Sequence, residues 1–199
     1  MDGKTLQRIK PLLITAPSGC GKGTLITRLV SDYGHIFKSN VSYTTRAPRN
    51  GEVHGVHRFF VSMDEFTKAI EDNKLIEFAK YADNYYGTHR DYINSIIADN
   101  KICIIEVEVQ GAKSISNTDL ECNFLFIEPP SFDALRDRLL HRGTETPERI
   151  AKRMEAAKWE LDEATKSGIF PTKLVNDDFE TFYAEVKKYL RTNYPAFEF

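Results

Sequence analysis

Apolar residues along this chain fall into two alternating patterns: short continuous runs, and longer segments in which apolar positions recur every three or four residues. Short runs are typical of buried strands, and the longer spacing is typical of helices that pack through one face. The expected strands are 12–15, 102–107, 123–128 and 173–176. The expected helices are 24–33, 131–141, 146–166 and 178–194. Because neighbouring parallel strands need a crossover connection, this alternation predicts an α/β fold with a parallel sheet flanked by helices.

Residues 38–98 interrupt this alternation and predict an inserted, strand-rich subdomain. Strands are expected at 58–61 and 75–81, and in the first of them side-chain alternation puts Arg58 and Phe60 on one face. Ser62 and Glu65 have the spacing of a capping box, which predicts a helix to residue 70. Thr88, followed three residues later by an acidic side chain, predicts the start of another helix that runs to residue 98.

The composition excludes several classes of protein. With 199 residues, 41% of them hydrophobic and 28% charged, the chain fits one ordinary globular domain. Its 27 Lys and Arg residues against 29 Asp and Glu residues give a net charge of −2, so there is no basic excess to indicate a nucleic-acid partner. Three cysteines without a CxxC spacing indicate neither a disulfide framework nor a zinc site. Since no apolar run is long enough for a membrane helix or a signal peptide, we expect a cytoplasmic protein without a membrane partner.

The strongest chemical motif is APSGCGKGT, between an expected strand and an expected helix. Its residues are Ala16, Pro17, Ser18, Gly19, Cys20, Gly21, Lys22, Gly23 and Thr24. Glycines let backbone N–H groups turn toward phosphate oxygens, the helix N-terminus adds its dipole, and Lys22 can reach the β- and γ-phosphates. Ala16 and Gly23 depart from the strict motif, which has glycine and a hydroxyl residue there. The motif predicts a nucleotide-phosphate site; the alternative is a glycine-rich turn without a ligand.

Two groups of arginines could bind further anions. Arg46 and Arg49 lie three residues apart, so their guanidinium groups would repel each other unless an anion lay between them. A solvated basic loop is the alternative at this position. The second group is Arg138, Arg142, Arg149 and Arg153, on either side of residues 143–146. These side chains could also pair with nearby carboxylates.

Cys20 lies inside the phosphate motif. A helix N-terminus and Lys22 could lower the pKa of its thiol, and alkylation would then inactivate the protein. The alternative is a small, shielded residue that does not react.

The chain resembles the guanylate kinase family over residues 11–189. The resemblance rests on APSGCGKGT, SYTTRAPRNGEVHG, LIEFAKYADNYYGT, ICIIEVEVQGAKS, FLFIEPPS, LLHRGTETPERIAKRM and VNDD. It implies a core of residues 1–37, 99–135 and 168–199, a GMP-binding insertion at 38–98, and a helical lid at 136–167. It also implies Mg²⁺-dependent transfer of the γ-phosphoryl group of ATP to GMP, which gives ADP and GDP.

The same resemblance assigns roles to individual positions. Residues 16–24 and Asn176 match the ATP-binding positions. The groups implied to stabilise the transferring phosphoryl group are Lys22, Arg138, Arg142 and Arg153. The positions that match GMP-binding residues are Ser42, Arg46, Arg49, Glu52, Arg58, Glu77, Tyr86, Thr88 and Glu108. Thr24 and Glu106 match positions that would hold Mg²⁺ through water.

Three departures from the family pattern concern these roles. Arg58 stands where the family has a phosphate-binding tyrosine. Glu106 and Glu108 replace aspartates and are one methylene longer. Gly23 removes the usual direct metal ligand.

Two other functions are alternatives to this one. Guanylate-kinase-like domains of membrane scaffolds are inactive and bind phosphorylated peptides, but this chain keeps Lys22 and the lid arginines. A kinase for AMP is disfavoured by Glu77, because guanine presents two adjacent donors to a carboxylate, whereas adenine N1 is an acceptor. Because no exposed apolar stripe is evident, we expect a monomer.

Overall fold

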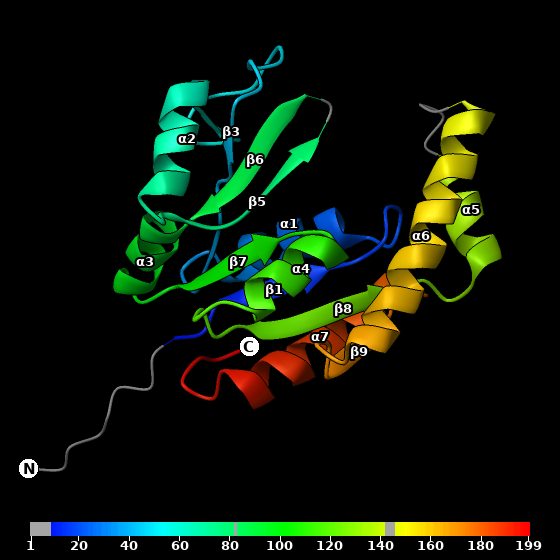
Figure 1. The fold of residues 1–199 in the computed structure, drawn as a ribbon. Helices are drawn as coiled ribbons and strands as arrows, with labels where there is room; N and C mark the ends of the chain where they lie inside the picture. Colours follow the sequence, from blue (N-terminus) through cyan, green and yellow to red (C-terminus); the bar gives the residue numbers. More distant parts are fainter. Residues whose placement is uncertain (1–8, 82, 142–145) are drawn as a thin grey trace, which may run out of the picture.

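The centre of the protein is a five-stranded parallel sheet. A computed structural model describes residues 9–81, 83–141 and 146–199. The strands of this sheet are β1 (Leu12–Thr15), β2 (Phe37–Ser39), β7 (Ile102–Glu106), β8 (Asn123–Glu128) and β9 (Thr172–Val175). Their order is β2-β7-β1-β8-β9, with every neighbouring pair parallel (Figure 1). The chain leaves β1 at the point where the strand order reverses, which is the usual ligand-binding edge of such sheets.

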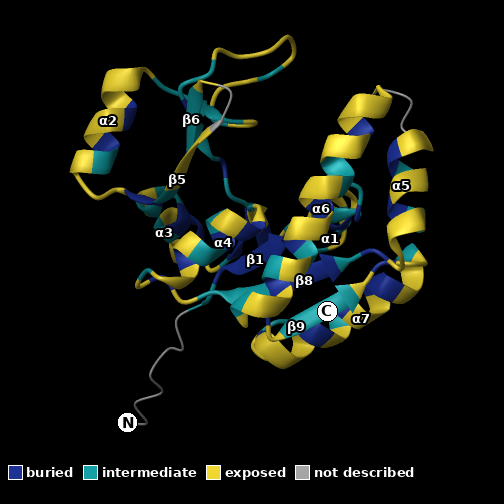
Figure 2. Cartoon of the chain, turned by 45° about the vertical axis from the view of Figure 1, so that its right-hand side comes forward, coloured by how far each residue is buried: buried dark blue, intermediate teal, exposed yellow. Residues whose placement is uncertain are grey.

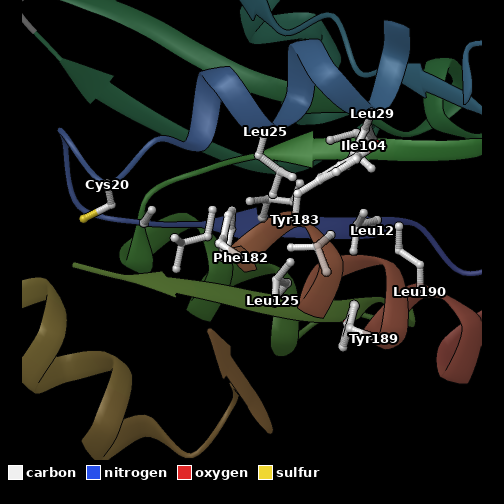
Figure 3. Packing of buried hydrophobic residues seen from close by; sticks show 14 of the residues in the cluster. Leu12, Cys20, Leu25, Leu29, Ile104, Leu125, Phe182, Tyr183, Tyr189 and Leu190 are labelled. Carbon is white, nitrogen blue, oxygen red and sulfur yellow. The ribbon is translucent and has the colours of Figure 1, made fainter. Parts of the chain in front are cut away.

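Helices cover both faces of this sheet. Leu12 and Ile14 of β1 share one hydrophobic cluster with α1 (Lys22–Tyr33) and α7 (Phe179–Asn193). Figure 3 shows Leu25 and Leu29 of α1, and Phe182 and Leu190 of α7, in this cluster. Leu13 points the other way, into a cluster with α3 (Arg90–Ala98) and α4 (Val109–Ser116). The two buried faces explain why the central strands are continuously apolar.

A second, four-stranded sheet is formed by the inserted segment. Its strands are β3 (Tyr43–Thr44), β4 (Phe59–Phe60), β5 (Leu75–Tyr81) and β6 (Asn84–His89), in the order β4-β3-β6-β5. Helix α2 (Met63–Glu71) packs on it through Phe66, which is 1% exposed. The capping box of Ser62 and Glu65 is present at the start of this helix.

Helices α5 (Phe132–His141) and α6 (Pro147–Ser167) form a pair. In Figures 1 and 2 the second sheet stands above the main sheet at the left, and this helix pair stands above it at the right. Thr146 caps α6 and Pro147 begins it, as the sequence predicts. The helix ends at Gly168, whose φ of 68° is left-handed. In Figure 2 the outer faces of both helices are largely exposed.

Most of the predicted elements are confirmed, and the errors lie in the insertion and around α4. The α/β fold with a parallel sheet is correct. Thr88 does not begin a helix: it lies in β6, and the ring of His89 caps α3 by accepting from the N–H of Asp91. The strands β2, β3 and β6 and the helix α4 were not predicted. Among the described residues, no helix is both long and apolar enough to cross a membrane.

Candidate active site

The phosphate motif forms the turn between β1 and α1. Gly19 and Gly21 have φ values of 97° and 90°, in the left-handed region that glycine adopts without strain. A Cβ atom on Gly21 would lie 2.3 Å from Nδ2 of Asn176, so the close approach also requires glycine here. The N–H of Cys20 donates to the carbonyl of Pro17 at 3.2 Å and closes the turn. The loop therefore leads into the N-terminus of α1, where unpaired N–H groups can bind an anion.

Asn176 links this loop to the segment after β9. Its side-chain amide donates to the carbonyl oxygen of Cys20 at 2.9 Å. Its backbone N–H donates to the carbonyl of Glu128, also at 2.9 Å. Because Asn176 is only 6% exposed, both contacts are shielded from water. This predicted ATP-binding residue thus fixes the shape of the loop that would hold the phosphates.

A cavity of about 630 Å³ opens beside the loop. Its lining includes Gly21, Thr24, Arg138, His141, Asn176 and Phe179. The guanidinium group of Arg138 donates to the carbonyl oxygens of Asn176 and Asp177, at 2.8 and 3.0 Å. His141 and Phe179 also line this cavity, and neither was predicted from the sequence as a site residue. His141 lies three residues after Arg138 on α5, and this helical spacing could have indicated it.

Charged residues of β7 and α6 lie beside the phosphate loop. The ammonium group of Lys22 lies 3.6 Å from Oε1 of Glu106, the last residue of β7. Arg153 of α6 donates to the hydroxyl of Ser18 in the loop. Gly23 and Thr24 are exposed in the first turn of α1. Arg142 lies outside the described residues.

The expectation of a reactive Cys20 is wrong. Its side chain is fully buried and belongs to the hydrophobic cluster below the loop (Figure 3). Burial raises the pKa of the Cys20 thiol to about 12, although the charges of Arg138 and Lys22 act in the opposite direction. Desolvation of the thiolate thus outweighs the nearby cations. The thiol is the shielded residue that the alternative described.

A second group of charged residues lies on the insertion. The Nη2 atom of Arg46 donates to both carboxylate oxygens of Glu52, at 2.9 Å each. The backbone N–H of Arg49 donates to the same carboxylate at 2.7 Å. The Arg46 side chain, followed by the Arg49 N–H, lowers the pKa of Glu52 to about 2. Glu52 therefore pairs with the Arg46 side chain and anchors the backbone at Arg49, so Arg46 has a negative partner within the chain itself.

Arg58 points toward this group. Its guanidinium carbon lies 5.6 Å from the ring centre of Tyr86, and that of Arg46 lies 5.8 Å from the ring centre of Phe60. Phe59 lies between Arg58 and Phe60 in the chain, and its ring packs against Tyr43 instead. The predicted alternation is confirmed, with Arg58 and Phe60 on one face. Arg58 and Arg46, which come from different segments of the insertion, thus both lie near Tyr86.

Glu77 and Thr88 form a separate, buried pair. The hydroxyl of Thr88, which is 1% exposed, donates to Oε1 of Glu77 at 2.7 Å. Burial raises the pKa of the Glu77 carboxyl, and the Thr88 hydrogen bond partly offsets this. Glu77 also approaches Gly111 of α4, the helix that the exposed Glu108 precedes as N-cap residue. Ser42 is half-buried, and its carbonyl accepts from the N–H of Phe59.

Comparison with known proteins identifies the family. The Guanylate kinase family model matches residues 8–193 of the chain. The chain belongs to the guanylate kinase family. Guanylate kinase 1 of rice is 45% identical over 181 residues, which are 91% of this chain and 47% of the rice protein. The guanylate kinase of pig is 38% identical over 181 residues, 91% of both chains. The chain thus spans about half the length of the rice relative and most of the pig one.

A solved guanylate kinase has the same fold. The crystal structure from Anaplasma phagocytophilum superposes with a TM-score of 0.65 and 25% identity. The superposition covers 93% of this chain and 86% of that one. The likeness therefore extends over the main sheet, the second sheet and the α5–α6 pair.

Proposed function

We propose that this chain transfers the γ-phosphoryl group of ATP to GMP, giving ADP and GDP. The observation that carries the proposal is that a chain of the guanylate kinase family holds two groups of cationic and N–H donors on different parts of the fold. One is the phosphate loop with Lys22; the other is the Arg46, Arg49 and Arg58 group of the insertion. Two such groups suit a reaction between two phosphorylated nucleotides.

On the donor side, the loop N–H groups and Lys22 would bind the ATP phosphates. The base would enter the cavity beside Asn176, which His141 and Phe179 also line. Arg138 and Arg153 already contact the edges of this site through backbone carbonyls and Ser18. Both could turn from these contacts to the transferring phosphoryl group, since phosphate binds guanidinium more strongly than a neutral oxygen does.

On the acceptor side, the nucleophile is an oxygen of the GMP phosphate, which is already anionic, so no general base is required. Arg46, Arg49, Arg58 and Tyr86 would bind this phosphate. The GMP phosphate would compete with the Glu52 carboxylate for the guanidinium group of Arg46. Glu77, held by Thr88, would accept the two adjacent guanine donors, with Ser42 and Glu108 nearby. Catalysis then consists of positioning the two substrates and stabilising negative charge.

The residues at the loop fit Mg²⁺. Glu106 and Thr24 offer a carboxylate and a hydroxyl, the hard oxygen donors that Mg²⁺ prefers. Gly23 offers none, and apart from its chain neighbours and its own helix backbone nothing lies within 4 Å of the position its Cβ would take, so water has room there. Mg²⁺ usually keeps several waters, which suits contacts made through water. When bound, it would neutralise part of the charge on the β- and γ-phosphates.

The test is a coupled assay of ADP release with ATP and each of GMP, dGMP, AMP, CMP and UMP. GMP should be the preferred acceptor. Lys22→Ala should remove nearly all transfer while its circular dichroism spectrum stays unchanged, because Lys22 fills no part of the core. Glu77→Gln should raise the KM for GMP by about a hundredfold or more, since an amide cannot accept from both guanine donors.

Three results would reject the proposal: no nucleotide turned over, unchanged turnover in Lys22→Ala, or AMP preferred to GMP. The inactive, phosphopeptide-binding alternative predicts the first of these together with binding of a phosphorylated peptide at the Arg46 group. Size-exclusion chromatography with light scattering would test the expected monomer.

A further inference from the structure

A glycine inside helix α4 occupies a position where the backbone does not require one. Gly111 is the third residue of α4, and its conformation is helical, not left-handed. Glycine destabilises a helix relative to alanine, so the reason for its presence lies in the space around it. Apart from its chain neighbours and its own helix backbone, the atoms nearest to the position of a Cβ atom are Cβ and Cγ1 of Val107, at 3.1 and 3.4 Å, and Oε2 of Glu77, at 3.7 Å. The missing side chain therefore leaves room in front of a carboxylate oxygen.

The Glu77 carboxyl group comes from the second sheet, and buried contacts hold its strand against α4. Ile76, the residue before it in β5, packs in the same hydrophobic cluster as Ala112 of α4. The pairing of β5 with β6 is irregular between Leu75 and Glu77, which indicates a β-bulge. A bulge redirects the side chains around it. Ile76 thus enters the core cluster, while Glu77 stands opposite Thr88 of β6.

The two oxygens of the Glu77 carboxylate have different neighbours. Oε1 accepts from the hydroxyl of Thr88 at 2.7 Å. Oε2, the oxygen beside Gly111, accepts no hydrogen bond from the described residues, so it can accept one from a ligand. Burial raises the pKa of this carboxyl group because it disfavours the charged form. A donor that reaches Oε2 would therefore stabilise the carboxylate.

The chemistry of guanine gives the two oxygens different partners. One edge of the base presents, in order, the O6 acceptor, the N1–H donor and the 2-amino donor. Thr88 has a single hydroxyl proton, which can turn from Oε1 to O6 once N1–H reaches Oε1. The base is then oriented with O6 toward Thr88. Its 2-amino group meets Oε2 of Glu77, beside Gly111.

We propose that Gly111 is a specificity-determining residue of the acceptor site: because it has no side chain, the 2-amino group of guanine fits between α4 and Oε2 of Glu77. An amino nitrogen that donates to Oε2 would lie about 2.9 Å from it. A methyl group on residue 111 would stand 3.7 Å from the same oxygen and take part of that space. The base of IMP has O6 and N1–H but no 2-amino group, so it does not need this room. The inference deepens the proposed function and rests on it.

The first experiment compares GMP with IMP in the wild type and in Gly111→Ala. Isothermal titration calorimetry measures the Kd of each nucleotide, and steady-state kinetics measures the KM values for GMP and ATP. In Gly111→Ala the Kd and KM for GMP should rise about tenfold, because one methyl group is misplaced in a shaped pocket. The Kd for IMP and the KM for ATP should change by less than about twofold. The matched control is Ser116→Ala, at the exposed last residue of α4, which should leave all these values within about twofold.

The second experiment separates the space at Glu77 from crowding at Val107. Val107→Ala removes Cγ1, so the new methyl group of Gly111→Ala can be accommodated on that side. If the space at Oε2 decides specificity, the preference for GMP over IMP should remain about tenfold lower in the double variant than in Val107→Ala alone. Return of the preference to the level of Val107→Ala would overturn the proposal. Equal weakening of GMP and IMP in Gly111→Ala, with or without a lower melting temperature, would overturn it as well.

Failure of this inference can be told apart from failure of the proposed function. Absence of GMP turnover in the wild type would reject the proposed function, and that result is seen before any variant is compared. A wild type that turns over GMP and prefers it to IMP, with the same preference in Gly111→Ala, would overturn this inference alone.

Discussion

The structure places Arg58 over Tyr86, near Arg46, where it would add a cation to the proposed GMP phosphate site. A charged, forked donor binds phosphate about twice as strongly as a neutral hydroxyl. Arg58→Ala should therefore raise the KM for GMP about tenfold, equivalent to about 1.4 kcal/mol. The KM for ATP should hardly change. Steady-state kinetics with each substrate varied in turn measures both values.

Salt dependence separates the charge of Arg58 from its size. Interactions between exposed charges are screened by salt, whereas a neutral hydrogen bond is much less affected. The KM for GMP should rise more steeply with salt in the wild type than in Arg58→Tyr. Equal KM values for GMP in wild type and Arg58→Ala, at low and high salt, would mean that the phosphate is held without Arg58.

Cys20 should not react in the native protein. With a pKa of about 12 against an ordinary value of 9.0, its thiolate is roughly a thousandfold scarcer at pH 8. Iodoacetamide should leave activity intact for hours, and mass spectrometry should find Cys20 unmodified. In guanidinium chloride, where burial is lost, the same thiol should be alkylated within minutes. Rapid inactivation of the native protein, with protection by ATP, would contradict the buried geometry.

At the scale of elements, the turn from β1 into α1 gives opposite predictions for two glycines two residues apart. Gly23 is an exposed helical residue with open space around its Cβ position, so Gly23→Ala should stabilise the protein by about 0.5–1 kcal/mol. Gly21→Ala should destabilise it by about 1–3 kcal/mol, because φ is 90° and the new atom would collide with Asn176. Urea unfolding measures both changes. Shifts of the same sign would contradict the loop geometry.

The elements that the sequence predicted well are those whose signals are local. The β1 strand has the predicted bounds, Leu12–Thr15, and Thr146 with Pro147 starts α6 as expected. β2 has three residues, with Lys38 exposed between its ends, so no apolar run indicates it. Thr88 carries a capping signal, but its hydroxyl donates to Glu77 instead, eleven residues away in the chain. The secondary structure at such positions depends on tertiary contacts, and a local sequence pattern carries no information about those contacts.

In the candidate site too, the residues of a local motif were predicted, and those that depend on tertiary contacts were not. The phosphate motif is contiguous, so its spacing alone predicts a loop that can bind an anion. The pairing of Arg46 with Glu52 depends on how residues 46–52 fold back, and the spacing of the arginines left a solvated loop equally open.

In the molecule as a whole, the cations of the two proposed sites stand at opposite ends of the main-sheet edge that carries the phosphate loop. Arg46 and Arg58 lie in segments next to β3 and β4 of the second sheet, and Arg138 and Arg153 lie on α5 and α6. Figure 1 shows the second sheet and the α5–α6 pair well apart. The chain as a whole has a net charge of −2, so the attraction for anions is local to these parts. Two anionic substrates bound between them would draw both sides together and exclude water from the transferring group.

This arrangement predicts that the two nucleotides stabilise the protein cooperatively. Each ligand at about 100 times its Kd should add about 2.7 kcal/mol, or roughly 5–10 °C in melting temperature for a chain of this size. Differential scanning fluorimetry with GMP, ADP and both together measures the shifts, and ADP with GMP cannot react. If both ligands favour the same approach of the two sides, the second binds a protein already ordered by the first. The free energy of stabilisation gained with both ligands should then exceed the sum of the two separate gains by about 1–3 kcal/mol.

Arg153→Ala should keep the melting-temperature shift caused by GMP and lose much of this excess, because Arg153 joins α6 to the loop at Ser18. Strictly additive shifts in the wild type would mean that the two sides bind their nucleotides independently.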